Sequence, residues 1–378
     1  MMKLLSVLFK KEVLDASRDK RSVMAGLYYA IGSPILMCLL FSVMLKQIAS
    51  PEDLKITIKN AEQAPNLVQY LESKEIVHGT GDDVKDIVLE ISDDFAVKMS
   101  EGRPATVTVI ADKSNDKLRK SISRLERSLA RYNSEVAGLR LLARGVDPTL
   151  MRAVDVQVHD QATPDSKGGI FLGVATLSIV LTLFYAAMNL AIDTSAGERE
   201  RNSIALLLSH PVSTLQIVMA KSGAIATFSM LGLALILVVS KFAYGMVPWE
   251  QLGFSVNLSI EFMLFCFVIG LPIALMSASL QVFVSFMAKS FKEAQTYVTM
   301  VLFVPMGLSM ITTYDVAIDF VQWLPIAAQQ YAMIEFIKGN DIPVAQLALS
   351  TLVTLGLFGV FSYLSSRMLK SEKVVFGL

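Results

Sequence analysis

Long apolar runs are the dominant pattern of the sequence. Six runs contain no charged residue and are close to, or longer than, the about 20 residues that a helix needs to cross a bilayer core. They cover residues 24–45, 169–192, 223–240, 262–288, 297–311 and 344–364. The fifth run is the shortest and contains Pro305. The pattern predicts a membrane protein whose transmembrane part is an all-α bundle of six helices, five of them within residues 169–378.

Residues 46–168, between the first and second runs, have a different pattern. Alternating apolar and polar residues at 105–110 and 154–159 predict strands. Apolar residues spaced by three and four predict a helix from Lys117 to about Arg144. Its apolar stripe consists of Leu118, Ile122, Leu125, Leu129, Tyr132, Val136, Leu139 and Leu142. We expect an inserted α+β domain, whose long helix packs either on its own sheet or on a second subunit.

Lysine and arginine collect in alternate connections. They occur before the first run, between the second and third, between the fourth and fifth, and after the sixth, whereas the opposite short loops hold only Lys241 and Lys338. Positive residues mark the cytoplasmic side. This predicts cytoplasmic termini and an extracytoplasmic α+β domain. Residues 1–23 are then either a cytoplasmic helix in the membrane interface or a charged flank that orients the first span.

The composition excludes several classes of function. The chain is 53% hydrophobic with a net charge of zero, so it presents no basic field for nucleic acid. No glycine is followed by lysine, so the phosphate-binding loop of a nucleotide hydrolase is absent, and no HExxH metal motif occurs. The apolar runs contain no histidine. We expect a protein with no catalytic or metal site and no directly bound cofactor.

Residues 196–210 form a compact charged and apolar segment after the second run. Ser195 and Glu198 have the spacing of a capping box, which predicts that a new helix begins here, and Pro211 ends it. Four alternating charges are followed by Ile204, Leu207 and Leu208 on one face. Such a helix either docks into a groove on another protein or lies on lipid headgroups.

The sequence of residues 196–221, AGERERNSIALLLSHPVSTLQIVMAK, resembles the segment after the second span of type-2 ABC transporter permeases, most closely the sodium-extrusion (NatB-type) branch. The family pattern is AGE[KR]ER, then serine or threonine, a leucine pair, a proline-valine step and a lysine. Relatives often have an acidic residue just before the leucine pair, where this chain has Ala205. KKEVLDASRDKRS is similar to the family's N-terminal elbow, and DDFAVKMSEGRPATVTVIADKSND to its outer domain.

The resemblance implies the permease subunit of an ATP-driven exporter in the bacterial inner membrane, among membrane lipids. A separate ABC ATP-binding subunit would hold ATP and Mg, and a second permease copy or close homologue would complete the path. Residues 196–210 would be the coupling helix. Its coupling residues would be Glu198, Arg199, Glu200, Arg201, Ser203, Leu206, Leu207 and Pro211. The branch suggests sodium as substrate, but related permeases export drugs, peptides or lipids. A different alternative is a membrane sensor or scaffold acting through its outer domain.

Polar residues within the runs are candidates for a translocation path. On the second run they share one face of about 80°. The candidates are Ser178, Thr182, Tyr185 and Asn189, with Ser277, Gln281 and Ser285 on the fourth run. These oxygen-bearing side chains either line a path for a hard cation or hold helices together. Residues 319–336 form either short re-entrant helices, with Gln329 and Gln330 at an outer gate, or an interfacial segment.

Overall fold

The computed structural model describes residues 2–49, 53–79, 84–151, 168–186, 188–249, 256, 258–314 and 320–371. The chain divides into two compact units. Unit 1 comprises Met1–Val43 and Gln161–Leu378, and unit 2 is Met44–Asp160. The second predicted strand, at residues 154–159, lies outside the described residues.

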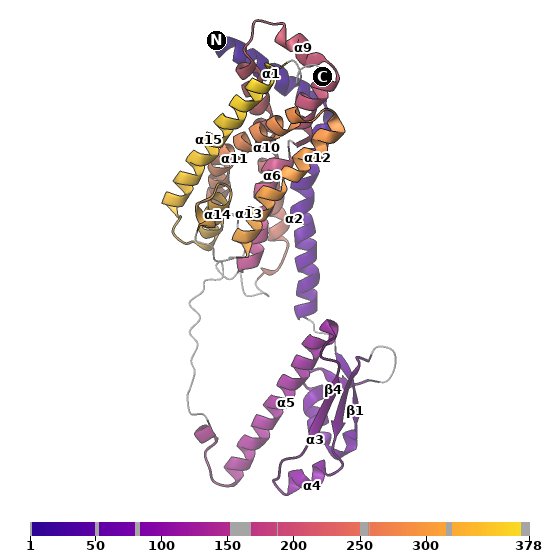
Figure 1. Ribbon diagram of the computed structural model, residues 1–378. Coiled ribbons are helices and arrows are strands. Elements are labelled where there is room, and N and C mark those ends of the chain that lie inside the picture. Colours follow the sequence, from indigo (N-terminus) through magenta and orange to yellow (C-terminus); the bar gives the residue numbers. More distant parts are fainter. Residues whose placement is uncertain are drawn as a thin grey trace. The chain divides into compact units, whose positions relative to one another are not determined.

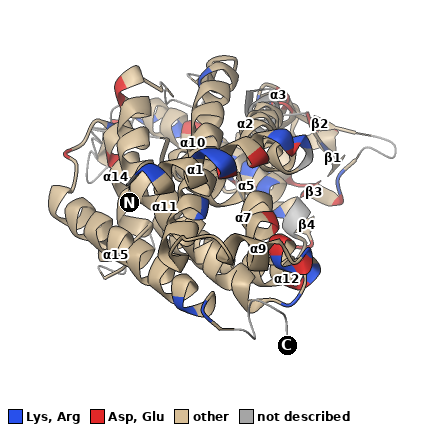
Figure 2. Ribbon diagram, turned by 90° about the horizontal axis from the view of Figure 1, so that it is seen from above, with Lys and Arg blue, Asp and Glu red and all other residues tan. Residues whose placement is uncertain are grey.

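Unit 1 is a bundle of helices (Figure 1). Six helical segments of the described chain are long and apolar enough to span a membrane, as the sequence predicts. They are Ser22–Val43, Phe171–Glu200, Thr214–Gly245, Ile260–Met287, Phe291–Thr313 and Val344–Met368. In Figure 2, α11 (Ile260–Met287) and α15 (Val344–Met368) carry almost no charged residue.

Large apolar side chains cover the outside of the bundle. Leu40 of α2 (Lys20–Ala49), Val268 of α11 and Leu352 of α15 are all more than half exposed. Buried serines, threonines and glutamines lie between the helices instead. Apolar side chains outside and polar side chains inside are the reverse of the arrangement in a water-soluble protein. A bilayer requires this arrangement, because lipid is as apolar as leucine and polar groups must find their hydrogen-bond partners within the bundle.

The fifth span consists of two helices. α12 (Phe291–Val301) and α13 (Phe303–Thr313) are separated by Leu302. Pro305 has no N–H to bond the carbonyl four residues earlier, so the break at this point has a local cause. α14 (Ala327–Lys338) follows and packs against α6 (Gly169–Tyr185), α11, α13 and α15.

The second span is also interrupted. α6 ends at Tyr185 and α7 (Met188–Ile192) follows, then a π turn (Asp193–Gly197) and α8 (Glu198–Glu200). Beyond it, the short α9 (Ser203–Leu208) leads to α10 (Thr214–Gly245), the third span. The N-terminal helix α1 (Met2–Arg18) packs on α10.

Unit 2 contains a four-stranded sheet with the order β2-β1-β3-β4. The strands are β1 (Leu54–Lys59), β2 (Ile76–His78), β3 (Ile87–Ile91) and β4 (Val107–Ala111). β1 pairs in parallel with β2 and β3, and β4 pairs antiparallel to β3. The prediction of a strand near 105–110 is therefore confirmed.

In the described residues of unit 2, the α-helices beside the sheet are α3 (Pro65–Glu72), α4 (Phe95–Ser100) and α5 (Asp116–Ala143). The predicted long helix is thus confirmed as α5. Leu118, Ile122 and Leu125 of its first half share a buried core with the strands and α3. The exposed Leu139 and Leu142 show that this packing does not continue along the second half.

Candidate functional site

The charged segment Glu198–Glu200 belongs to the second span, and the predicted helix start at Ser195 is wrong. The hydroxyl of Ser195 donates to the carbonyl of Ala191, one turn earlier, and does not cap a new helix. Serine inside a helix commonly makes this back-bond. The π turn carries the helix on to Glu200, and Asn202, with φ 57°, ends it. The helix predicted over residues 196–210 is therefore reduced to the six residues of α9.

Arg199 and Glu200 of the motif bind backbone groups of distant helices, and Arg201 pairs within its own span. Arg199 is buried and donates to the carbonyls of Phe286, at 3.2 Å, and Ala288, at the end of α11. The carboxylate of Glu200 accepts the backbone N–H of Phe291 at 3.0 Å, at the start of α12. Arg201 forms an ion pair with Asp193 at 3.1 Å. The contacts of Arg199 and Glu200 complement the partial charges of helix ends, negative at the C-terminus of α11 and positive at the N-terminus of α12.

The fourth charge, Glu198, belongs to a buried ion cluster of Lys11, Glu12, Glu198 and Lys221. The ammonium of Lys221, on α10, has no exposed side-chain surface and lies 2.8 Å from Glu198 and 3.2 Å from Glu12. Lys11 contacts the same two carboxylates at 3.7 and 3.2 Å. The cluster joins α1, the end of the second span and the third span. Buried charges are tolerated only when paired, so these elements are held together by the balance of the cluster.

Lys11 is the half-exposed member of the ion cluster. Burial by itself lowers the pKa of its ammonium, but Glu12 and Glu198 oppose this and leave the pKa above its ordinary value. Lys11 therefore stays charged at neutral pH and completes the neutralisation of the two carboxylates.

An apolar groove of about 550 Å³ opens beside the ion cluster. It is lined by residues of α1, α8, α9 and the turn that follows: Leu4, Val7, Leu8, Lys11, Glu198, Ser203, Leu206, Leu207, His210, Pro211 and Val212. Val7 and Leu206 are each 67% exposed. The groove joins the predicted coupling residues Ser203, Leu206, Leu207 and Pro211 to α1. Sequence reasoning missed the contribution of α1, although the apolar spacing of Leu4 and Leu8 was a signal.

The predicted path residues of the second and fourth spans lie together but bond mainly to helix backbone. Ser178 and Thr182 donate to carbonyls of their own helix. Ser277 donates to the carbonyl of Leu183, and Gln281 to that of Phe184 at 2.9 Å. These carbonyls belong to the last turn of α6, so α11 is hydrogen-bonded to the C-terminal end of that helix.

The other three path candidates have different surroundings. The ring of Tyr185 stacks on that of Tyr29, with 4.7 Å between centroids. Ser285 is buried, and its hydroxyl has no hydrogen-bond partner among the residues that the structure describes. Asn189 is half-buried. A role for any of these residues in transport stays a prediction.

We expect Gln281→Ala to lower transport while the ATP-binding subunit still associates. The substitution leaves the carbonyl of Phe184 without its amide donor, which is expected to destabilise the interrupted region by about 1–3 kcal/mol. Asn189→Ala is expected to act in the same direction. Flux assays and co-purification on each variant test this, and unchanged flux in both would remove these residues from the path.

Gln329 and Gln330 do not face an exit; both are fully buried. Gln329 donates to the hydroxyl of Thr354, on α15, at 3.0 Å. Gln330 donates to the carbonyl of Gly173 at 3.2 Å and the hydroxyl of Thr313 at 3.1 Å. Exposure at a gate was the wrong expectation, because the amides of α14 satisfy polar groups of neighbouring helices inside the bundle.

Within the described ranges, no group of three or more His, Cys, Asp or Glu side chains could hold a metal ion.

Comparison with known proteins identifies the family of the chain. The pattern of the ABC-2 family transporter proteins matches residues 25–366. The chain belongs to the ABC-2 family. This ABC-2 permease is also 24% identical over 322 residues to the ABC transporter permease protein NatB of Bacillus subtilis (strain 168). The match covers 80% of this chain and 81% of NatB. No solved structure shows significant similarity.

Membership of the ABC-2 family makes the chain a multi-pass membrane subunit of a transporter, distinct from the ATPase. It also implies an ABC ATP-binding partner subunit.

Proposed function

We propose that this ABC-2 permease extrudes sodium ions, driven by a separate ATP-binding subunit that docks on the apolar groove between α1 and α9. The observation that carries the coupling proposal is the buried ion cluster beside this groove. It ties α1 and the end of the second span to α10. Sodium is supported by the resemblance of residues 196–221 to the sodium-extrusion branch and by the similarity to NatB.

The contacts of the charged motif suggest how movement of the docked ATP-binding subunit reaches the transmembrane helices. A displacement of α9 reaches α10 through Glu198 and Lys221, and reaches α11 through the bonds of Arg199 to its last carbonyls. Because both connections are buried, closure of the ATPase moves these helices as a body. Two permease copies or close homologues, in the bacterial inner membrane with cytoplasmic termini, would then rearrange around one path.

Leu206→Asp tests the docking surface. Leu206 is 67% exposed, so the change is expected to leave the permease folded. It places a charge in an apolar groove, and losing one central interface residue weakens binding by about 30-fold. The measurement is the affinity of the ATP-binding subunit for the permease in nanodiscs, together with permease-dependent ATP turnover.

Ser209→Asp is the matched control for this experiment. It adds the same charge three residues along, at an exposed position that does not line the groove. Wild-type affinity is expected for Ser209→Asp. Equal affinities for Leu206→Asp and the wild type would place the docking surface elsewhere.

The substrate is tested by ATP-driven uptake into inverted vesicles that contain the permease and its ATP-binding subunit. Sodium accumulation that requires both proteins and ATP is the expected result. Uptake of dye, peptide or lipid probes without sodium would identify an exporter of another class. Normal assembly without uptake of any probe would favour a sensor acting through unit 2.

A further inference from the structure

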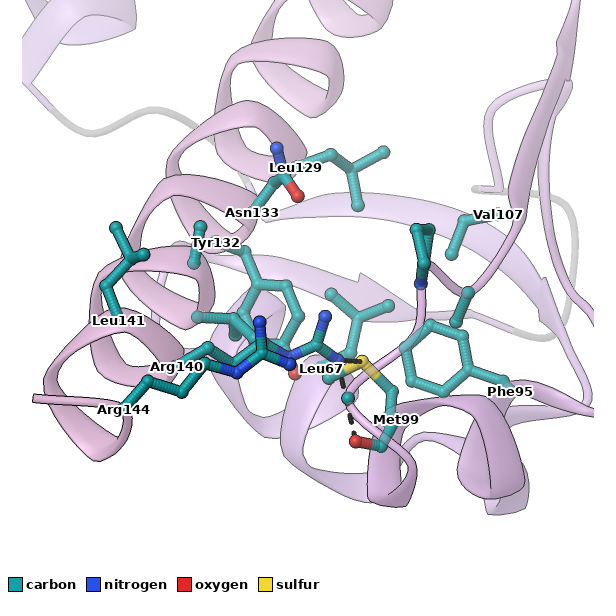
Figure 3. Close-up of a pocket in the computed structure, with 15 residues that line it drawn as sticks. Leu67, Phe95, Met99, Val107, Leu129, Tyr132, Asn133, Arg140, Leu141 and Arg144 are labelled. Atoms are coloured by element: carbon teal, nitrogen blue, oxygen red, sulfur yellow. Dashed lines mark hydrogen bonds between the residues drawn. The ribbon is translucent and has the colours of Figure 1, made fainter. Parts of the chain in front are cut away.

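Unit 2 contains a pocket of about 490 Å³ between the second half of α5 and the segment from α4 to β4 (Figure 3). Phe95, Leu129 and Val136 contribute to its apolar wall. Its polar groups include Arg140 and Arg144, and Figure 3 shows both guanidinium groups near Met99. The volume lies within the about 300–1,000 Å³ typical of small-molecule sites.

The pocket follows from a mismatch in length. α5 has 28 residues, or about 42 Å, whereas the strands that it covers have three to six. Its apolar stripe therefore extends past the buried core, which ends near Leu129 and Tyr132. Val136, Ala137 and Leu141 continue along the pocket wall. Opposite them the chain turns at Gly102, whose φ of 72° favours glycine.

Two positive charges share the α4–β4 side of this pocket. Arg140 donates to the carbonyls of Met99, at 3.5 Å, and Arg103, at 3.3 Å. A Cβ on Gly102 would lie 3.4 Å from the guanidinium of Arg144, so both arginines reach the same loop. The guanidinium of Arg144 has no hydrogen bond or ion pair to any residue that the structure describes, and no acidic residue lines the pocket. Adjacent guanidinium groups without a counter-charge attract an anion, and their planar forks match a carboxylate.

A neutral donor lies beside these charges. Tyr132 lines the pocket, and burial raises the pKa of its phenol, although Arg140 acts in the opposite direction. The phenol therefore keeps its proton at neutral pH and can donate to an oxygen of the same anion.

We propose that this pocket binds an amphipathic carboxylate of the fatty-acid type. The carboxylate accepts from Arg144 and Arg140, and the acyl chain lies along Phe95, Leu129 and Val136. This site belongs to unit 2 alone, so it does not depend on the transport proposed for unit 1. It makes the inserted domain a ligand-binding module of the permease.

The test uses the full-length protein in lipid nanodiscs with a diazirine derivative of decanoic acid. After photolysis, peptide mapping is expected to place the label on residues of the pocket wall. Excess decanoate is expected to remove the labelling and excess decanol to leave it, because the alcohol lacks the charge that the arginines recognise. Mapping to individual residues separates this signal from probe dissolved in the lipid.

Two variants and one control complete the design. Arg144→Glu reverses the charge of an exposed arginine and is expected to reduce pocket labelling about tenfold or more. Ala137→Trp fills the pocket and is expected to abolish labelling without changing its charge. Arg127→Glu alters an exposed arginine of α5 outside the pocket and is expected to label as the wild type. Circular dichroism checks that each variant is folded.

The proposal is overturned if label maps outside the pocket, or if Arg144→Glu and Arg127→Glu label equally. Equal competition by decanol and decanoate would also overturn it, because the pocket would then bind apolar chains without recognising the anion.

Discussion

Lys221→Met is expected to be the most damaging single substitution in unit 1. It leaves the carboxylates of Glu12 and Glu198 buried together with only Lys11, at 3.2 and 3.7 Å, as counter-charge. Removing one partner of a buried ion pair lowers the free energy of unfolding by about 3–5 kcal/mol. We expect an apparent Tm about 10 °C below that of the wild type, measured on purified protein in nanodiscs.

Two further variants show whether the lower Tm of Lys221→Met comes from the unbalanced charge or from loss of the lysine side chain. Glu12→Gln combined with Lys221→Met restores balance, since Glu198 keeps Lys11, and is expected to recover part of the loss. Lys241→Met makes the same substitution at an exposed site on α10, and the variant is expected to have the Tm of the wild type. A wild-type Tm for Lys221→Met would show that the ion cluster does not hold the three elements together.

Gly26→Ala is expected to have the second largest effect, because α2 and α6 meet through bare backbone at this residue. A Cβ at Gly26 would lie 1.9 Å from the carbonyl oxygen of Ala186. Ala186 cannot retreat freely, because a Cβ at Gly232, on α10, would lie 2.3 Å from its own Cβ. Overpacking typically lowers the free energy of unfolding by about 1–3 kcal/mol. Because the added methyl group would meet backbone, which cannot move aside as a side chain can, we expect a loss at or above the upper end of this range.

Gly32→Ala provides the comparison on the same helix. Nothing lies within 4 Å of a Cβ added at Gly32, so the substitution is expected to be neutral or to stabilise by up to about 1 kcal/mol. Thermal unfolding and vesicle transport are measured for both variants. If Gly26→Ala unfolds and transports as Gly32→Ala does, the close approach of the first and second spans is not required.

The features that the sequence predicts correctly are those with a local physical cause. A bilayer demands about 20 apolar residues per helix, so the six spans follow from composition alone. α5 follows from apolar residues at helical spacing.

The features that the sequence did not reveal depend on contacts between distant residues. Ser195 and Glu198 have the spacing of a cap, but the buried end of the second span satisfies the serine through Ala191 and continues as a π turn. Gln329 and Gln330 looked like gate residues, but helices α6, α13 and α15 supply their partners.

Hydrophobic patterning alone thus determined how many times the chain can cross the membrane and where the α+β insertion lies. Only the tertiary structure decided that Lys221 meets Glu12, 209 residues away, and Glu198 in one buried cluster. Spacing along one helix specifies which residues share a face. It does not specify which face of another helix they meet, because that depends on close packing of the whole bundle.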